Sequence, residues 1–418
     1  MFGPFVMTVA LLTIGTELLR GEVASTNGQW LADQLTQLGF EIAAMETVAD
    51  HHEKLVATLK RLLDTHSLVI ATGGLGPTTD DLTTAAAAEV AGVELATNHD
   101  ALATIRHRIE ERGDELRPGH DKQALLPVGG ELLPNTEGTA PGFILRTGGA
   151  SVYCLPGVHR EMQHMFEHQV VPRIRGAASN DGYTVCLHTF GPHESWLADR
   201  LESLKLEHPD VTVGYQATGS SIDLRIHARG PDYAQARDRV KRAVDEARTR
   251  LGDVIYGEGD QTMALLAGRA VRKRGWRLAI AESCTGGLIS HQLTSQPASD
   301  YLVGGAVTYA NSAKTSLLGV SEDTLRGHGA VSAEVAAELA EGARRVFDCE
   351  VGISATGIAG PTGAAPDKPI GLCHWAVAHP DGTELEQRVF SGTRSQVQHK
   401  AAHAVLALLR RTLAGNNL

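Results

Sequence analysis

The sequence lacks the features of a secreted or membrane protein. Its five cysteines (Cys154, Cys186, Cys284, Cys349 and Cys373) are far apart, and no pair has the CxxC spacing. They therefore predict neither a disulfide framework nor a zinc site, and they are typical of a reducing compartment. No apolar run approaches the roughly 18 residues that a membrane-spanning helix needs, and the amino terminus has no basic start or cleavage site of a signal peptide. We expect a soluble, cytoplasmic protein with no membrane partner.

Positive charge and aromatic residues are also scarce. The chain has 38 Lys and Arg against 49 Asp and Glu, a net charge of −11, which argues against nucleic acid as a partner because phosphate contacts need a surplus of cations. Only 5% of its residues are aromatic, whereas 45 of the 418 are glycine, a balance common in α/β enzymes with many tight turns. A chain of this length predicts two or three domains.

The pattern of apolar residues divides the chain into three parts. Residues 1–172 alternate strand and helix patterns, which predicts a doubly wound parallel sheet. Residues 173–258 contain strands with strict apolar–polar alternation beside long helices, which predicts a small α+β module. Residues 259–418 return to alternating strands and helices and predict a second α/β domain.

The first candidate site is the segment ATGGLGPTTDDLT, residues 71–83. Gly73, Gly74 and Gly76 allow the backbone to approach a ligand closely, and the start of the following helix favours an anion such as phosphate. The carboxylates of Asp80 and Asp81 leave two alternatives open. Either one of them caps that helix in an ordinary tight turn, or they hold a cation such as Mg²⁺ against phosphate oxygens.

The second candidate site is the segment RLAIAESCTGG, residues 277–287. Ser283 and Cys284 are rival nucleophiles at the end of a strand, where neighbouring side chains point to opposite faces. We favour Ser283, because a cysteine that faces inward is more often a small buried hydrophobe. Gly286 and Gly287 are expected to direct backbone N–H groups towards an oxyanion.

Several motifs occur together and in order: GTELLRG…STN, GGLGPTTDDLT, KQALLP, GTAPGF, LPGV…EM and AESCTGG. With them the chain resembles the CinA (competence/damage-inducible protein A) family almost from end to end. The resemblance implies an amino-terminal domain similar to the molybdopterin-binding MoaB/MogA/MoeA fold, a KH-like middle module and a carboxy-terminal nicotinamide-nucleotide amidase domain. The middle module has no GxxG loop, so we expect a spacer or dimerisation element rather than a nucleic-acid clamp. The resemblance also implies a homodimer.

For the amino-terminal domain the resemblance implies a metal-dependent ADP-ribose pyrophosphatase, with Asp50 and Asp81 as catalytic residues and Mg²⁺ or a similar divalent ion as cofactor. His159 departs from the family pattern, which has proline there. The expected metal ligands are Asp80, Asp81 and Glu17. The expected substrate-binding residues are Gly73, Gly74, Gly76, Thr78 and Asn27.

For the carboxy-terminal domain the resemblance implies a Ser–Lys hydrolase that converts nicotinamide mononucleotide to nicotinate mononucleotide and ammonia without a cofactor. The matching nucleophile and base are Ser283 and Lys314, and Tyr309 and Thr356 complete the catalytic set. The expected substrate-binding residues are Gly286, Gly287, Gly357, Gly360 and Arg394. The loop at 356–363 is expected to cradle the nucleotide phosphate, although it could also be a plain series of turns.

The residues themselves allow a check on Lys314. A serine needs a base to take its proton, and a lysine acts as one near neutral pH only if its pKa falls from about 10.4 to roughly 7–8. If Asn311 or Ser312 caps the helix that follows, Lys314 lies in its first turn, where the helix dipole disfavours a cation. Burial must supply the rest of the shift.

Arg394 has two interpretations. Its planar guanidinium fits phosphate oxygens, but a surface ion pair is equally compatible with the sequence. The competing hypothesis for the whole chain is a nucleotide- or molybdopterin-binding adaptor in competence or DNA-damage responses with little catalysis.

Overall fold

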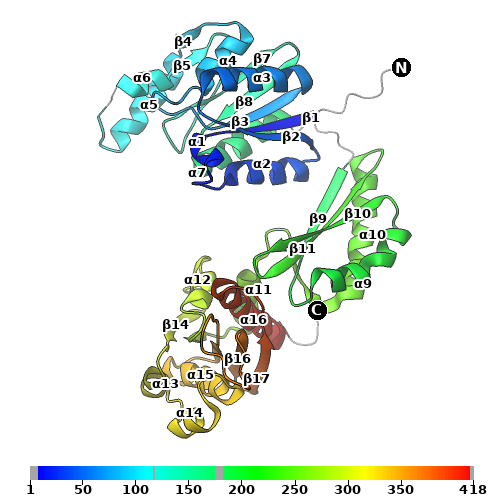
Figure 1. Cartoon of the computed structure of the whole chain (residues 1–418), viewed down its shortest axis with the longest axis vertical. Helices are drawn as coiled ribbons and strands as arrows, with labels where there is room; N and C mark the ends of the chain where they lie inside the picture. The colour runs from blue at the N-terminus through cyan, green and yellow to red at the C-terminus, as the bar shows by residue number, and fades with distance from the viewer. Residues whose placement is uncertain (1–7, 116–117, 175–181, 415–418) are drawn as a thin grey trace. The chain divides into compact units, whose positions relative to one another are not determined.

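The computed structural model describes residues 8–115, 118–174 and 182–414 (Figure 1). They form two compact units. The first comprises Met1–Thr184 and Arg229–Arg237, and the second comprises Val185–Ala228 and Asp238–Leu418. No helix in the described ranges is both long enough and apolar enough to cross a membrane.

The first unit contains a six-stranded sheet with the strand order β2-β1-β3-β8-β7-β6. Its four parallel strands are β2 (Glu41–Val48), β1 (Thr8–Ile14), β3 (Leu68–Thr72) and β8 (Ala150–Leu155). The antiparallel strands β7 (Gly142–Thr147) and β6 (Glu131–Leu133) complete one edge. The central strands β1 and β3 are buried on both faces, as continuous apolar runs such as VALLTI predict.

Helices cover both faces of this sheet, which confirms the doubly wound prediction (Figure 1). α3 (His52–Thr65) and α4 (Thr83–Ala91) pack on one face, where Leu55, Leu59 and Leu62 of α3 enter the core. α2 (Thr26–Gln37) and α7 (His159–Met165) pack on the other. A smaller lobe beyond the sheet contains α5 (His99–Glu111), α6 (Pro118–Gln123) and the short antiparallel pair β4 (Leu95–Thr97) and β5 (Leu125–Pro127).

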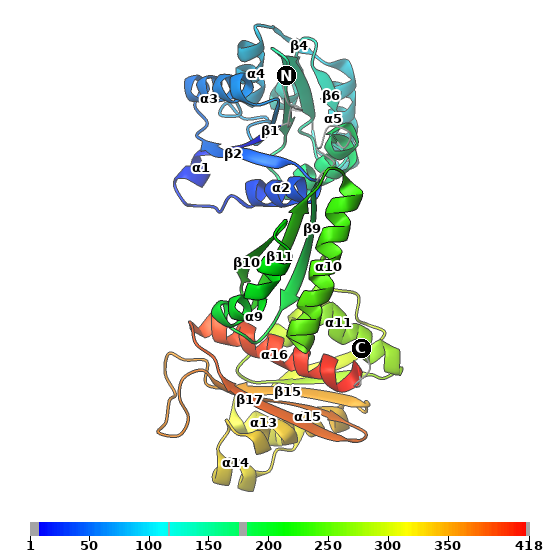
Figure 2. The ribbon, with the colours of Figure 1, turned by 90° about the vertical axis from the view of Figure 1, so that its right-hand side faces the viewer.

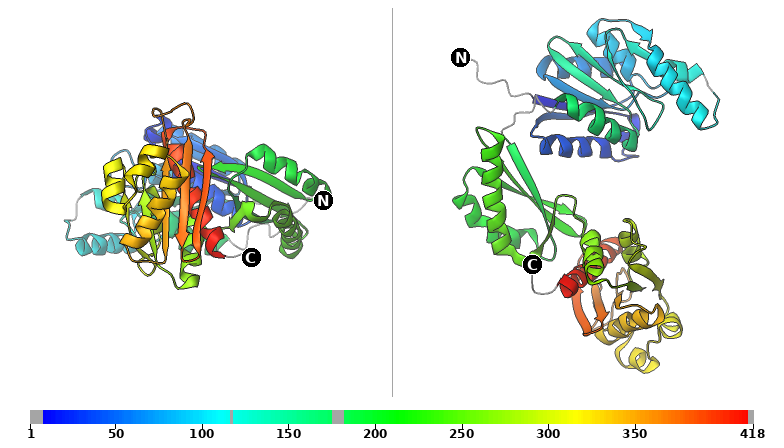
Figure 3. Two further views of the ribbon diagram at one scale, coloured as in Figure 1. Left: turned by 90° about the horizontal axis from the view of Figure 1, so that it is seen from below. Right: turned by 180° about the vertical axis from the view of Figure 1, so that it is seen from behind.

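The middle module is a four-stranded sheet with the order β10-β11-β9-β12, whose helices α9 (Glu194–Glu207) and α10 (Tyr233–Leu251) lie on one face (Figure 3). β9 (Gly182–Thr189) and β11 (Ser221–Arg229) match the predicted alternating strands. β10 (Val211–Thr218) and β12 (Ile255–Glu258) were not predicted. β10 forms a hairpin with β11, and the alternation of VTVGYQAT before the turn at 218–221 is the signal that identifies it.

The carboxy-terminal domain has a five-stranded sheet with the order β14-β13-β15-β16-β17. β14 (Leu302–Val307), β13 (Leu278–Glu282) and β15 (Val351–Gly357) are parallel, whereas β16 (Leu372–His379) and β17 (Gly382–Val389) form an antiparallel hairpin. β17 was missed because it is an exposed edge strand with mostly polar residues.

The two faces of this sheet carry separate helical layers (Figure 2). α11 (Met263–Arg274), α12 (Leu288–Thr294) and α16 (Arg394–Ala414) pack on one face. α13 (Asn311–Leu318), α14 (Glu322–His328) and α15 (Ala333–Val346) lie on the other. Because β13, β14 and β15 are parallel, their carboxyl ends lie at one edge of the sheet. Ser283 follows β13, Tyr309 follows β14, and Thr356 lies near the end of β15.

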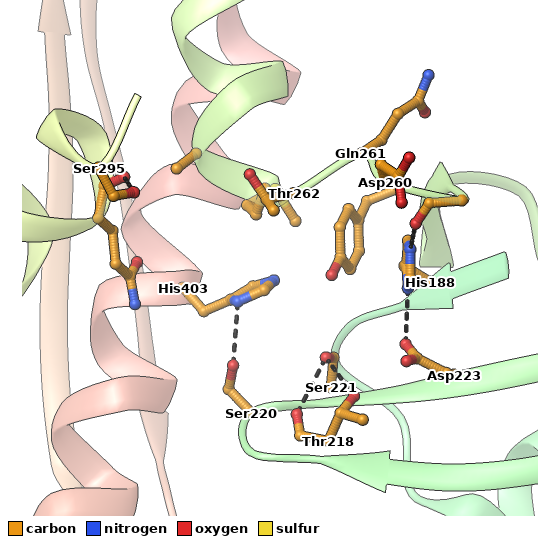
Figure 4. A pocket seen from close by; sticks show the side chains of 15 residues that line it. His188, Thr218, Ser220, Ser221, Asp223, Asp260, Gln261, Thr262, Ser295 and His403 are labelled. Carbon is orange, nitrogen blue, oxygen red and sulfur yellow. Dashed lines mark hydrogen bonds and ion pairs between the residues drawn. The ribbon is translucent and has the colours of Figure 1, made fainter. Parts of the chain in front are cut away.

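His403 lies in the middle of α16 and packs against the middle module within the second unit (Figure 4). Its ring stacks on Phe190 with the centroids 4.5 Å apart, and its Nδ1 lies 3.0 Å from Ser220 Oγ. Burial, and to a smaller extent the neighbouring His188, lowers the pKa of His403 to about 4. A neutral imidazole is therefore part of the packed interior.

We predict that His403 makes the stability of the second unit fall as the pH drops from about 6.5 to about 4. The pKa is about 6.5 in the unfolded chain and about 4 in the folded chain, so the unfolded state binds more protons in this interval. The loss of unfolding free energy is at most about 3 kcal/mol. Thermal unfolding between pH 7.5 and 4.5 measures it. His403→Gln cannot titrate but can still bond Ser220, so its Tm should fall less with pH; identical pH profiles would refute the prediction.

Candidate functional site

A cavity of about 410 Å³ opens at the carboxyl edge of the amino-terminal sheet. Residues from the ends of β1, β2, β3 and β8 line it, as expected for a ligand site in a doubly wound fold. Seven predicted site residues meet in its wall: Glu17, Asp50, Gly73, Gly74, Gly76, Asp80 and Asp81. The motifs KQALLP, GTAPGF and LPGV…EM, which follow this loop in the sequence, contribute Gln123, Thr139 and Glu161, to which no role had been assigned.

The glycines of the loop are required by close contacts. Gly73 has φ of +110°, and a Cβ there would lie 2.3 Å from the carbonyl oxygen of Ile14. A Cβ on Gly76 would lie 2.5 Å from Oδ2 of Asp81. Neither position accepts a side chain without displacing the backbone or a carboxylate of the site.

The carboxylates of this cavity are held by neighbouring backbone and hydroxyl groups. Asp50 Oδ2 accepts hydrogen bonds from Thr16 N at 2.7 Å and from Thr16 Oγ1 at 3.0 Å. Asp81 Oδ2 accepts hydrogen bonds from Thr78 N at 2.8 Å and from Thr78 Oγ1 at 2.7 Å. Thr78 thus orients a carboxylate from outside the cavity wall, although it was predicted to contact the substrate.

Of the two alternatives for Asp80 and Asp81, the structure does not show the helix cap. α4 begins at Thr83, its N-cap residue is Leu82, and no side chain caps it. Asp80 instead accepts a hydrogen bond from Thr78, and this bond, assisted by the charge of Lys122, lowers the pKa of Asp80. Lys122 Nζ also donates to the carbonyl oxygen of Asp81 at 2.8 Å, a contact that the sequence did not indicate.

The donor set of the cavity suits a hydrated magnesium ion. No three of its carboxylates converge to a single point, since the only cluster of three ligating groups in the described ranges lies elsewhere. Mg²⁺ commonly uses one or two carboxylates together with waters and substrate phosphates. Asp80, Asp81 and Glu17 are therefore suited to supply some of the ligands of Mg²⁺, with water and phosphate oxygens supplying the others.

Asn27 lies behind the cavity wall and not in it. Its Nδ2 donates to the carbonyl oxygen of Gly157 at 2.7 Å and to Thr72 Oγ1 at 3.2 Å. His159, which departs from the family pattern, lies 2.6 Å from Asn27 Oδ1 through its Nδ1. Asn27 therefore positions the loop around Gly157, which is part of the wall.

In the carboxy-terminal domain, the buried carboxylate of Glu282 organises the turn that carries Ser283. Its Oε2 accepts hydrogen bonds from Gly287 N at 2.9 Å and Ile289 N at 3.1 Å. Its Oε1 accepts bonds from Ser290 N at 2.9 Å and Ser290 Oγ at 2.7 Å. Sequence reasoning missed this residue, although an acid directly before a glycine-rich helix start is a recognisable signal.

These bonds determine which backbone N–H groups of the turn can face an oxyanion. The N–H of Gly287 donates to Glu282, and that of Gly286 donates to the carbonyl oxygen of Ser283 at 3.2 Å, so neither is available for an oxyanion. Their positive φ values, +64° and +101°, shape the turn instead. In the part of the chain that the structure describes, the N–H groups of Cys284 and Thr285 are the two amides of this turn that have no hydrogen-bond partner.

Lys314 is almost completely buried, with 1% of its surface exposed, in the first turns of α13. The N-cap of that helix is Ala310 and not Asn311 or Ser312, and Lys314 is the fourth residue of the helix. Lys314 Nζ donates to the carbonyl oxygens of Thr308 at 2.8 Å and Tyr309 at 3.1 Å. Burial lowers the pKa of Lys314, and the nearby thiol of Cys284 opposes that shift.

The structure brings the two predicted catalytic residues to neighbouring strand ends. Ser283 follows β13 and is 8% exposed, and Lys314 is tethered to the end of β14, the strand next to β13. No hydrogen bond joins Ser283 Oγ to Lys314 Nζ within the described ranges. Such contacts often tighten only when substrate binds.

Cys284 lies in the hydrophobic core, as expected for the residue after the nucleophile. However, its thiol is close enough to influence the pKa of Lys314. The two candidate nucleophiles can be separated by substitution.

Tyr309 and Arg394 meet at the same edge of the sheet. Arg394 donates from Nη2 to the Tyr309 hydroxyl and from Nη1 to the carbonyl oxygen of Gly360, both at 2.7 Å. Across the described ranges, no carboxylate forms an ion pair with Arg394. Its charge is therefore not neutralised, and Tyr309 is 60% exposed beside it.

Thr356 and Gly357 close the other side of this edge at the end of β15. Thr356 Oγ1 donates to the carbonyl oxygen of Ala330 at 2.7 Å. A Cβ on Gly357 would lie 2.6 Å from Cys373 Sγ, so this glycine is required for packing against β16.

Comparison with protein families assigns each part of the chain. Residues 10–176 match the family described as "Probable molybdopterin binding domain". Residues 184–257 match the "Damage-inducible protein CinA KH domain", and residues 260–413 match the "CinA C-terminal domain". These matches confirm the expected molybdopterin-binding-like domain, KH-like module and CinA carboxy-terminal domain.

Relatives of known name match over nearly the whole length. A CinA-like protein of Geobacter sulfurreducens is 40% identical over 410 residues, covering 97% of this chain and 99% of its own. Another, from Anaeromyxobacter dehalogenans, is 39% identical over 411 residues, covering 97% and 100%. A crystal structure of the protein CinA from Thermoplasma acidophilum is 32% identical, covers 41% of this chain and 98% of its own, and has a TM-score of 0.38. With matches at this identity from end to end, the chain belongs to the CinA family.

Proposed function

We propose that the protein is a bifunctional hydrolase of pyridine nucleotides. Its carboxy-terminal domain converts nicotinamide mononucleotide to nicotinate mononucleotide and ammonia with Ser283 as nucleophile and Lys314 as base. Its amino-terminal domain hydrolyses ADP-ribose with the help of a divalent cation. The observation that best supports the amidase activity is the burial of Lys314, which lowers the pKa of this residue.

The contacts of Lys314 support its role as a base. A neutral amine has two N–H bonds and one lone pair, and the two carbonyl oxygens of Thr308 and Tyr309 can accept both N–H bonds. The lone pair then remains to take the proton of Ser283 Oγ as this oxygen attacks the amide carbon. The resulting ammonium returns the proton to the leaving nitrogen, the C–N bond breaks, and ammonia departs.

The acyl-enzyme formed in this way is an ester of Ser283. Water attacks the ester carbon, Lys314 takes the proton of the water, and Ser283 Oγ recovers it as the C–O bond breaks. The N–H groups of Cys284 and Thr285 are the donors of this turn available to the negative oxygen. Arg394, whose charge no carboxylate neutralises, suits the substrate phosphate.

In the amino-terminal domain, the proposed reaction cleaves the phosphoanhydride of ADP-ribose to AMP and ribose 5-phosphate. The backbone of Gly73, Gly74 and Gly76 lines the cavity that would hold the pyrophosphate. Asp50 is held through Oδ2 by Thr16, and its Oδ1 can accept the proton of the attacking water. Asp80, Asp81 and Glu17 would hold a divalent cation such as Mg²⁺, which would supply charge neutralisation for the phosphates when bound.

We predict that Ser283→Ala lowers the rate of ammonia release from nicotinamide mononucleotide by at least about 10³-fold, because it removes the attacking atom. Cys284→Ala is the matched control and should retain most of the activity. Release of ammonia is measured with an enzyme-coupled assay on the full chain, and circular dichroism checks the fold of both variants. A loss in Cys284→Ala with full activity in Ser283→Ala would reverse the assignment.

We also predict that kcat/KM of this reaction rises with pH, because only the neutral amine of Lys314 accepts a proton. The folded pKa is lowered by burial, so activity is lost as the pH falls through that value and not near the ordinary pKa of lysine. Lys314→Met keeps an unbranched buried side chain without a base and should show little activity at any pH. An unchanged pH profile in this variant would exclude Lys314 as the base.

For the amino-terminal site we predict that AMP release from ADP-ribose requires Mg²⁺, stops on addition of a chelator, and falls by at least about 10²-fold in Asp50→Asn and Asp81→Asn. Asp64→Asn, at an exposed position of α3 outside the cavity, is the control and should be unaffected. AMP is quantified by chromatography. ADP-ribose that binds in calorimetry without being cleaved would favour the alternative, a binding adaptor.

A further inference from the structure

Three side chains with different ligating atoms, none of them assigned to either candidate active site, converge on the face of the middle module's sheet opposite α9 and α10. Cys186 and His188 are two residues apart on β9 and therefore point to the same face of the sheet. Asp223 lies on β11, the neighbouring strand. One ligating atom from each lies within 4.8 Å of the other two.

The chemistry of this cluster is that of a transition-metal site. A thiolate, an imidazole and a carboxylate together are typical ligands of Zn²⁺, and three protein ligands leave one tetrahedral position for an exchangeable group. His188 Nδ1 lies 2.7 Å from Asp223 Oδ1. Two ligands of a tetrahedral zinc ion at about 2.0 Å each lie roughly 3.3 Å apart, so a small rotation of either side chain admits an ion.

The second nitrogen of His188 is already arranged as it is in metal-binding histidines. His188 Nε2 lies 2.6 Å from the carbonyl oxygen of Gly259, so an N–H at this position fixes the ring and turns Nδ1 towards Asp223 (Figure 4). The N–H of Gly259 in turn donates to the carbonyl oxygen of Cys186 at 3.0 Å. Asp260, the next residue, adds a negative charge that acts on His188.

A large cavity gives access to the cluster. His188 and Asp223 line a pocket of about 560 Å³ within the second unit, together with hydroxyl side chains that include Ser220, Ser221 and Thr262 (Figure 4). A water or a small oxygen ligand in this pocket can reach the position that the three protein ligands leave open.

We propose that Cys186, His188 and Asp223 bind one divalent transition-metal ion of the Zn²⁺ class, with the fourth position open to the pocket. Binding replaces the thiol proton of Cys186 and the proton shared by His188 and Asp223, so both protons are released to solvent. The site is independent of the proposed hydrolase activities. Through Gly259 it fixes the segment that leads from β12 to α11.

The test is a titration of the full chain with Co²⁺, which takes the same tetrahedral sites and gives visible absorption, together with a near-ultraviolet band only when a thiolate is bound. We expect one Co²⁺ per chain with this thiolate band, and displacement of the cobalt by Zn²⁺. Cys186→Ser should abolish the thiolate band, and Cys349→Ser, which changes a buried thiol elsewhere, should retain it.

His188→Gln and Asp223→Asn provide a second measurement if Cys186→Ser does not fold. Each should weaken Co²⁺ binding by more than the 10- to 100-fold loss that is usual for changes to outer-shell partners. Binding should weaken as the pH falls, because protons compete with the metal for the thiolate and imidazole ligands. A folded wild-type chain without the thiolate band, or a Cys186→Ser variant that keeps it, would overturn the proposal.

Discussion

Burial of the Lys314 amine is the constraint on which the carboxy-terminal site depends. An ammonium ion loses much of its hydration when it is enclosed, so the enclosed group favours the neutral form. The carbonyl oxygens of Thr308 and Tyr309 satisfy the N–H bonds that remain. These two residues follow β14, which pairs with β13. The register of this pair therefore determines the position of the Lys314 amine relative to the turn that contains Ser283.

The two candidate active sites are built by the same local arrangement. In each, a carboxylate at a strand end accepts hydrogen bonds from the backbone of a neighbouring turn. Asp50 receives the N–H of Thr16, and Glu282 receives those of Gly287, Ile289 and Ser290. A charge that fixes several backbone amides makes the turn rigid before a ligand arrives, which is the preorganisation that catalysis needs.

The sequence predicts the large features of this protein because they follow from periodicity. Alternating patterns predict the two α/β domains, and parallel strands deliver the residues that follow them, such as Asp50 and Asp81, to one edge. The sequence does not predict which hydrogen-bond partner each polar group of a site has in the folded chain. The sequence leaves open whether Asp80 or Asp81 caps a helix or holds a cation, and it does not reveal that Thr78 donates hydrogen bonds to the Asp81 carboxylate. It predicts that Gly286 and Gly287 let backbone N–H groups face an oxyanion, but it does not reveal that Glu282 accepts the N–H of Gly287 itself.

Strands with few apolar residues are the other limit of prediction. β17 lies at an exposed edge, where polar residues are tolerated on both faces and the usual alternation disappears. The Cys186–His188 pair shows a related limit. Two ligating residues two positions apart on a strand do not predict a metal site by themselves. The third ligand, Asp223, is 35 residues later than His188 and reaches the pair only in the folded sheet.

α16 is a single straight element that takes part in two different environments. Arg394, its first residue, holds Tyr309 and the loop at Gly360, and His403 lies nine residues further along, against the middle module. At about 1.5 Å per residue the two contacts are roughly 13 Å apart along one axis. Because a helix keeps its length, a shift of α16 along its axis that changes the packing of His403 also moves the guanidinium of Arg394.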